Sequence, residues 1–452
     1  MTAAKNILFL SIEDLNDWVE PLGGHPQTIT PNITRLAKRG MLFENAYAPV
    51  PACSPSRTAT LFGQNPWETG IYANAHKWHD VYPTGARKSL VGRMRDAGFE
   101  TFGAGKVFHQ TAAHHDAHDW TDYNLLDQNK FAPISKVLKN GDIGHLSDFG
   151  PCPNDETLND EHNTDWICER MNRDSTGQFW ALGLYRPHLP FIVPQRYFDM
   201  FDGDIADPPG LGANQFDPDN LSPQAELPKA GRFIANRNAN LGRALHDMGE
   251  YKDFIRAYLA SIAYADALLG RVLDRMDELA LWDNTLVVLW SDHGWQLGEK
   301  LTFRKFSLWE RALRVPLIFA GAGVDVGQTQ EPVSLIDIAP TLFAQCNLPQ
   351  PDQFSGQNLS PLFTNPNETL RGHAVSIWGK NLDTEKCKHA ISVRTSDYRH
   401  ILYWDGGHEF YDHRIDPFEH CNRCDDPSLD EIIAAHLDCI PAQMAPPITV
   451  KS

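Results

Sequence analysis

The sequence has no long hydrophobic run, few cysteines and a deficit of positive charge. Its 452 residues include 8 cysteines, and 40 lysines and arginines stand against 58 aspartates and glutamates, which gives a net charge of −18. No stretch reaches the roughly 20 apolar residues of a membrane-spanning helix. The opening segment MTAAKNILFLSIEDLND has one lysine and a short apolar run that ends in carboxylates, which is not typical of a secretion signal. We therefore expect a cytoplasmic chain with no membrane partner.

The acidic balance argues against nucleic acid as a main partner, because the surface and the phosphate backbone would repel each other. It does not exclude a small anionic substrate, since a basic pocket can lie within an acidic surface. Eight cysteines in a chain of this length do not form a disulfide scaffold, and a reducing compartment keeps them as thiols. A hydrophobic content of 42% is sufficient for a sizeable core.

Apolar runs of strand length alternate with amphipathic segments. NILFLSI (6–12) and the apolar part of NTLVVLWSDHG (284–294) indicate buried parallel strands, whereas residues 30–40 and 251–282 have helical spacing. This alternation predicts an α/β fold with a largely parallel central sheet flanked by helices. In such sheets the functional site lies beyond the carboxyl ends of the strands.

The composition changes along the chain. Residues 110–176 and 202–250 are rich in Asp, Asn, Gly and Pro, and we expect long loops over the edge of the sheet there. From about residue 370 the pattern is a short meander followed by a helix. We therefore predict a catalytic α/β domain over 1–369 and a smaller C-terminal α+β subdomain over 370–452.

Charged or ionisable side chains follow four of the predicted strands. Because parallel strands end at the same edge of a sheet, we expect them to converge. Each is a weak signal alone, since acid pairs are common in turns and most lysines are solvated. The residues are Glu13, Asp14, Asp292, His293, Lys106 and His188.

Cys53 lies in the stretch PACSPSRTATLF (51–62). Ser54 can cap a helix and Pro55 suits its first position, so we expect Cys53 at a helix N-terminus. The helix dipole and Arg57 would stabilise an anion there. Cys53 could be a core residue, a thiolate nucleophile or a modified residue. A disulfide is disfavoured by the cysteine content.

The stretch CSPSR is similar to the C-x-P-S-R signature of the type I, formylglycine-dependent sulfatases of the alkaline phosphatase superfamily. Other blocks resemble those of the family in the same order, and the spellings GKVFH and YRPHLPF are closest to the iduronate-2-sulfatase-like branch. The resemblance implies an alkaline-phosphatase-like fold and hydrolysis of a sulfate monoester, either a sulfated sugar or a small organic or aryl sulfate. The blocks are NILFLSIEDLNDW, TPNITRLAKRGMLFENAYA, GKVFH, RPHLPF, SDHGWQLGE, RKFSLWE, VSLIDIAPTL and FYDHRIDPFEH.

The resemblance also implies that a formylglycine-generating maturation enzyme oxidises Cys53 to an aldehyde. The hydrated aldehyde is a geminal diol. One hydroxyl, made an alkoxide by a divalent metal, attacks sulfur and expels the alcohol. Deprotonation of the second hydroxyl re-forms the aldehyde and releases sulfate.

The family pattern assigns the metal to Glu13, Asp14, Asp292, His293 and the modified Cys53. Such hard oxygen ligands favour calcium as the first choice, with magnesium or manganese as the second. The sequence departs from the pattern at two positions. Glu13 stands where aspartate is usual, and His293 stands where many members have asparagine.

The resemblance also assigns roles to five other side chains. Lys106 and Lys305 would bind sulfate oxygens and offset developing negative charge. Arg57 would hold the modified side chain. His109 would take the proton from the diol, and His188 would protonate the leaving oxygen or hold the sulfate.

Two other functions stay open. A phosphonate or phosphate ester hydrolase of the same superfamily would use the same nucleophile and metal. A non-catalytic protein that binds a sulfated ligand is the second alternative, and the departure at Glu13 is the hint for it.

Three motifs admit a simpler interpretation. We expect HQTAAHHDAHDW (109–120) to be a solvated loop and the thiols of HCNRC (420–424) to be coincidental neighbours rather than zinc ligands. NAHKWHD (74–80) could line the substrate pocket or be a surface loop that packs Trp78.

Overall fold

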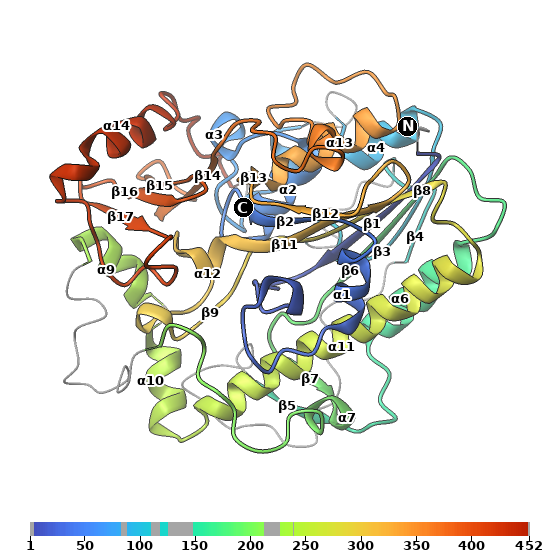
Figure 1. Cartoon of the computed structure of the whole chain (residues 1–452), viewed down its shortest axis with the longest axis horizontal. Helices are drawn as coiled ribbons and strands as arrows, with labels where there is room; N and C mark the ends of the chain where they lie inside the picture. The colour runs from blue at the N-terminus through green and yellow to red at the C-terminus, as the bar shows by residue number, and fades with distance from the viewer. Residues whose placement is uncertain are drawn as a thin grey trace.

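The computed structural model describes residues 4–82, 88–109, 118–124, 148–211, 227–237 and 239–450. Its centre is a nine-stranded sheet with the order β12-β2-β11-β8-β1-β6-β3-β4, and β13 also pairs with β2 (Figure 1). The strands are β1 (Asn6–Ile12), β2 (Gly40–Tyr47), β3 (Glu100–Gly105), β4 (Asp122–Asn124), β6 (Gln178–Leu184), β8 (Thr285–Ser291), β11 (Arg314–Gly321), β12 (Gly327–Thr329) and β13 (Val333–Ser334).

Most neighbouring strands of this sheet are parallel. β1 runs parallel to both β6 and β8, and β3 runs parallel to β4 and β6. β11 is the exception, since it is antiparallel to both β2 and β8. The expected α/β fold with a largely parallel central sheet is therefore confirmed.

Helices cover both faces of the sheet, which explains why β1 and β8 are mostly apolar and fully buried. Ile7 and Phe9 pack into the core on one face, whereas Leu8 and Leu10 pack into the core on the other. The first face carries α2 (Cys53–Phe62), α4 (Leu90–Asp96) and α13 (Ile338–Gln345), and the second carries α1 (Pro31–Ala37), α6 (Asn159–Arg170) and α11 (Tyr251–Glu278).

The expectation of loops over 110–176 and 202–250 was wrong in part. Residues 159–170 form α6, and α9 (Lys229–Asn236) and α10 (Ala239–Asp247) follow later. The sequence of α6 is mostly polar, and three of its four buried residues, Asp160, Asn163 and Thr164, are polar too. Packing against α11 therefore stabilises a helix that has no apolar stripe. Residues 110–117, 125–147 and 212–226 lie outside the described part.

Short elements complete this part of the chain. They lie in the segments that join the strands of the sheet to the longer helices. They are α3 (Pro66–Thr69), β5 (Phe149–Cys152), β7 (Phe191–Pro194), α7 (Gln195–Phe198), β9 (Gln296–Leu297), β10 (Phe303–Arg304) and α12 (Glu310–Leu313). None of the described helices is long and apolar enough to cross a membrane.

The C-terminal part is an antiparallel meander with one helix against it, as expected (Figure 1). Its apolar side chains continue the core above the first face of the sheet, so the division at 369/370 stays a prediction. Its elements are β14 (Ala374–Lys380), β15 (Lys388–Arg394), β16 (Tyr398–Leu402), β17 (His408–Asp412) and α14 (Asp430–Asp438).

Buried ion pairs join the two parts. Glu310, at the start of α12, pairs with Arg394 over 3.3 Å and with Arg399. Nε of Arg399 also lies 2.6 Å from Oε1 of Glu419. Arg399 and Glu419 are almost completely buried, so these charges compensate each other away from water.

Candidate active site

The parallel pairing of β1 and β8 brings two acidic strand ends together. Ile12 is in register with Ser291, so Glu13–Asp14 and Asp292–His293 leave the sheet side by side. The amide of Asp14 donates to Oδ1 of Asp292 over 3.1 Å. Asp14 has a left-handed backbone (φ 55°), a conformation that is uncommon for residues other than glycine and is often found at functional sites. All four of these site residues are fully buried.

Cys53 is the first residue of α2, as expected, but the predicted cap was wrong. Ala52 occupies the N-cap position and Ser54 lies inside the helix. The Ser54 hydroxyl donates instead to the carbonyl of His76 over 3.0 Å, and the Ser54 amide donates to Oδ1 of Asn74. The NAHKWHD segment therefore anchors the start of α2, and its Trp78 packs against Phe62.

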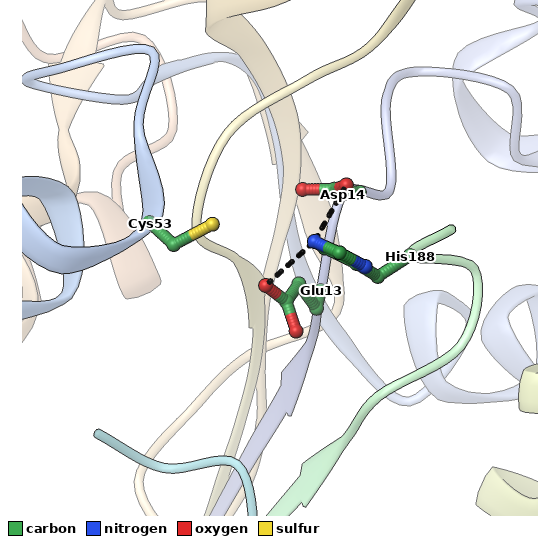
Figure 2. Close-up of side chains that lie close together, drawn as sticks. All are labelled: Glu13, Asp14, Cys53 and His188. Atoms are coloured by element: carbon green, nitrogen blue, oxygen red, sulfur yellow. Dashed lines mark ion pairs between the residues drawn. The ribbon is translucent and has the colours of Figure 1, made fainter. Parts of the chain in front are cut away.

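The side chain of Cys53 points toward the acidic strand ends (Figure 2). Its Sγ lies 2.9 Å from Nζ of Lys305 and 3.4 Å from Nε2 of His293. Burial opposes ionisation of the thiol, but the charges of Lys305 and Lys106 lower the pKa of Cys53 to about 7.

The residues that converge here fit a divalent cation. Ligand atoms of Asp14, Cys53, Asp292 and His293 lie within 4.8 Å of one another, and Glu13, Asp14, Cys53 and His188 form an overlapping set. Glu13 Oε2 and Asp14 Oδ2 are buried with no hydrogen-bond partner among the described residues. Because an unpaired buried carboxylate oxygen is costly, a cation at this position would remove that cost.

The pKa values of the three acids differ because their neighbours differ. Burial raises the pKa of Asp14, and Lys305 offsets this only partly. Burial acts on Glu13 too, but Lys106 and other positive charges hold its pKa well below the ordinary value. Asp292 is also buried, yet Arg57 lowers its pKa to about 2. Glu13 and Asp292 are therefore carboxylates at neutral pH without any added ion.

Arg57 joins α2 to two strand ends. Its Nε lies 3.0 Å from Oδ2 of Asp292, and its Nη1 donates to the carbonyls of Lys106 and Val107 over 2.5 Å and 3.0 Å. The proposed role of holding the modified Cys53 side chain stays a prediction. In the structure Arg57 orients Asp292 and the segment that carries Lys106.

Two buried lysines pair with the acids that follow β1. Nζ of Lys106 forms an ion pair with Oε1 of Glu13, and Nζ of Lys305 lies 2.9 Å from Oδ1 of Asp14. Lys305 is held between two left-handed residues, Arg304 (φ 68°) and Phe306 (φ 74°). Lys305 therefore lies beside Cys53 and Asp14, and Lys106 lies beside Glu13.

Two histidines complete the predicted set. Nε2 of His188 lies 3.8 Å from both Glu13 Oε1 and Asp14 Oδ2, and its Nδ1 faces the carbonyl of Leu189 (Figure 2). Burial lowers the pKa of His188. Burial and the charge of Lys106 lower the pKa of His109 to about 3, so that its imidazole is neutral at physiological pH.

A family model described as Sulfatase matches residues 5–348. The chain belongs to the sulfatase family. A second model, described as N-sulphoglucosamine sulphohydrolase, C-terminal, matches residues 298–442. The matched ranges together include every predicted site residue of this sulfatase.

Two individual relatives extend the comparison. A sulfatase of Formosa agariphila is 35% identical over 437 residues, which cover 92% of this chain and 82% of the relative. Iduronate 2-sulfatase of Mus musculus is 28% identical, with 89% and 85% covered. The resemblance to the iduronate-2-sulfatase-like branch is confirmed.

Solved structures share the fold of this sulfatase. Phosphonate monoester hydrolase of Agrobacterium radiobacter superimposes with a TM-score of 0.75 at 19% identity, covering 96% of this chain and 94% of the other. A protein in complex with its substrate D-glucosamine-2-N,6-O-disulfate gives a TM-score of 0.73 at 20% identity, with 96% of both chains covered. These matches confirm the alkaline-phosphatase-like fold.

Three residues of the site were not predicted. Tyr258 of α11 donates from its hydroxyl to the carbonyl of Asp14 over 2.7 Å, and Ser56 donates to the carbonyl of Asp292 over 2.5 Å. Ser291 donates from its hydroxyl to the carbonyl of His293. Ser56 belongs to the CSPSR signature, which could have indicated it. Tyr258 gives no signal, because it lies in a long helix among other buried aromatics.

The thiols of HCNRC do not form a metal site in the described part of the sulfatase. Cys421 and Cys424 are free, and neither belongs to a group of potential metal ligands. The histidine-rich segment HQTAAHHDAHDW lies mostly outside the described residues.

Proposed function

We propose that this sulfatase cleaves a sulfate monoester with formylglycine derived from Cys53 and a divalent cation, with calcium as the first choice. The observation that carries the proposal is the convergence of Cys53, Asp14, Asp292 and His293 within 4.8 Å. A thiol, two carboxylates and an imidazole from separate parts of the chain meet there out of contact with solvent. Burial of so many charges is costly unless they serve a site.

Cys53 and the acidic residues would hold the two groups. When bound, the cation supplies Lewis-acid activation and lowers the pKa of a coordinated hydroxyl. Formylglycine supplies a geminal diol, in which one hydroxyl is the nucleophile and the other allows sulfate to leave. Asp14, Asp292 and His293 would hold the cation, together with Glu13, whose Oε2 is unsatisfied among the described residues.

The chain's own cations and histidines account for the remaining chemistry. Lys305 lies between Cys53 and Asp14, so its charge would stabilise an anionic nucleophile and an adjacent sulfate oxygen. Lys106 forms an ion pair with Glu13. His109 is neutral at physiological pH, which is the form that a general base requires. His188 points Nε2 at the acids and can hydrogen-bond a sulfate ester oxygen.

The substrate class is a sulfated sugar or a small organic or aryl sulfate. Three named similarities support it: iduronate 2-sulfatase, choline-sulfatase of Rhizobium meliloti, and the structure in complex with D-glucosamine-2-N,6-O-disulfate. These names describe the relatives, and they define the compounds to be screened here.

The test is a screen of sulfated compounds with protein co-produced with a formylglycine-generating enzyme. We expect release of inorganic sulfate from at least one ester, and intact mass should show conversion of the Cys53 thiol to an aldehyde. Full conversion without sulfate release from any ester would favour the non-catalytic binding protein.

A phosphonate or phosphate ester hydrolase is the second candidate, since a phosphonate monoester hydrolase shares the fold. Matched aryl sulfate, phosphate and phosphonate esters distinguish the two. Sulfate monoesters carry one negative charge and phosphate monoesters about two, so the charges of Lys106 and Lys305 bear on the choice. A higher kcat/KM for the phosphonate ester would reverse our assignment.

A further inference from the structure

A row of contacts leads from the reactive cysteine to the C-terminal sheet. Lys305 donates to Cys53, and its Nζ lies 5.9 Å from the ring centre of Phe306. The ring of Phe306 is stacked on Trp378 of β14, with ring centres 5.2 Å apart and an interplanar angle of 28°. The strand that carries Trp378 is therefore a neighbour of the site.

Two lysines lie at the far end of this strand and of its partner. Lys380 is two residues beyond Trp378, so it lies on the same face of the sheet, about 7 Å further along the strand. It is directly opposite Lys388 of β15. Like charges at directly opposed positions destabilise a sheet.

Nothing in the described part of the chain neutralises this pair. Neither Lys380 nor Lys388 forms an ion pair there, although Asp383 and Glu385 lie in the hairpin between them. Lys388 is exposed and Lys380 is half-buried. Two adjacent ammonium groups without a carboxylate partner are well suited to bind an anion.

Aromatic side chains lie beside the lysines. Nζ of Lys380 lies 4.6 Å from the ring centre of Phe233 in α9, and the Phe233 ring meets that of Trp404 edge-on at 6.0 Å. Phe233 is 39% exposed and Trp404 is half-buried. α9 lies next to the C-terminal sheet (Figure 1), where Gly231 faces Tyr403. The cation–π contact fixes the position of the Lys380 ammonium group but supplies no counter-charge, so the group can still bind an anion.

We propose that Lys380 and Lys388 form a second anion-binding subsite for an extended, acidic saccharide whose sulfate ester lies at Cys53. The subsite would hold a carboxylate or a further sulfate on a neighbouring sugar, with Phe233 and Trp404 as its apolar wall. The proposal rests on the proposed function, which it narrows from sulfate esters in general to saccharides with at least two anionic groups.

The first experiment measures binding without turnover. Cation-loaded protein with Cys53→Ala is titrated by calorimetry with three oligosaccharides of equal length, one with a single sulfate, one with a sulfate and a uronate carboxylate, and one with two sulfates. Lys380→Ala with Lys388→Ala should weaken binding of one or both doubly charged compounds by about 10- to 100-fold and make it less dependent on salt. Binding of the single sulfate should change much less. Lys5→Ala, an exposed lysine at the amino end of β1, is the matched control.

The second experiment uses the matured, active enzyme. The ratio of kcat/KM for the doubly charged saccharide to that for a small aryl sulfate should fall by about 10-fold or more in the double variant, and Lys380→Arg with Lys388→Arg should restore most of it. Equal affinities and an unchanged ratio would overturn the subsite. Absence of sulfate release together with lysine-dependent binding would refute the proposed function and leave the subsite supported. If binding weakens mainly for the oligosaccharide with a uronate, the subsite binds a carboxylate. If it weakens mainly for the oligosaccharide with two sulfates, the subsite binds a second sulfate.

Discussion

The backbone amide of Asp14 donates to the side chain of Asp292 over 3.1 Å, although the two residues are 278 positions apart. Asp292, which follows β8, thereby orients the chain at Asp14, where it leaves β1. Both are proposed metal ligands, and a displacement of either one would move the other. The proposed cation site therefore depends on two neighbouring strands rather than on one loop.

Metal removal should lower both stability and activity. Three acids, Glu13, Asp14 and Asp292, lie together in a buried site, and a cation relieves their mutual repulsion. We expect thermal unfolding of chelator-treated protein to shift upward by several degrees on addition of calcium, with recovery of activity. Asp14→Asn should reduce this shift, whereas Asp274→Asn, an exposed acid on α11, should not. Full activity with no bound metal by elemental analysis would contradict the assignment.

Replacement of Cys53 should abolish turnover and preserve the fold. Cys53→Ala removes the precursor of the nucleophile, and we expect a fall in kcat of about 10³-fold or more. The residue is small and lies at a helix start, so circular dichroism should be unchanged. Cys421→Ser, at an exposed cysteine, is the control and should retain wild-type rates. Retention of most activity by Cys53→Ala would refute the mechanism.

His188 and His109 should differ in their response to the leaving group. If His188 assists departure of the alcohol, His188→Asn should slow alkyl sulfates by about 10²-fold more than activated aryl sulfates, which need no proton. His109→Gln should slow both to the same degree, because its proposed role follows the departure of the alcohol. Rates measured for a series of sulfate esters with increasing leaving-group pKa give the dependence on the leaving group for each variant. A slope unchanged by His188→Asn would assign this residue to sulfate binding instead.

The C-terminal sheet should be sensitive to acid. His400 is buried and its Nε2 lies 3.2 Å from Nδ1 of His408; burial and the nearby His408 and His436 lower its pKa to about 3. Because the folded state binds this proton less readily than the unfolded state, the contribution of His400 is complete above about pH 6.5 and decreases as the pH falls toward 3.

The free energy of unfolding should therefore fall by up to about 1.4 kcal/mol per pH unit from this group. His400→Gln should flatten the dependence of the melting temperature on pH between 6.5 and 4. His246→Gln, at a half-exposed position on α10, serves as the control. An identical slope in the His400 variant would exclude His400 as the source.

Much of the site could be predicted from the sequence, because its residues follow apolar strands of a parallel sheet. Glu13, Asp14, Asp292 and His293 come directly after β1 and β8, and the pairing of those strands brings them together. Lys305 and His109 follow no comparable pattern, and the family resemblance alone indicated them.

The remainder depends on contacts that no local pattern encodes. Tyr258 reaches Asp14 from 244 positions away, and its partner is a backbone carbonyl, which every residue has. The cap of α2 was predicted from residue preference, but the backbone places Ala52 there and turns Ser54 toward His76. Helix α6 forms through packing on α11 rather than through an apolar stripe.

The ion pairs of Glu310 with Arg394 and Arg399 set a limit on recombination. A chimera that kept residues 1–369 and received a foreign C-terminal region would remove Arg394 and Arg399 from Glu310, which would keep only Arg314, at 3.9 Å, as an ion-pair partner and lose stability. A chimera that keeps these ion pairs therefore has to exchange the meander together with α12. Sequence changes in one half of this network are tolerable only when the other half changes with them.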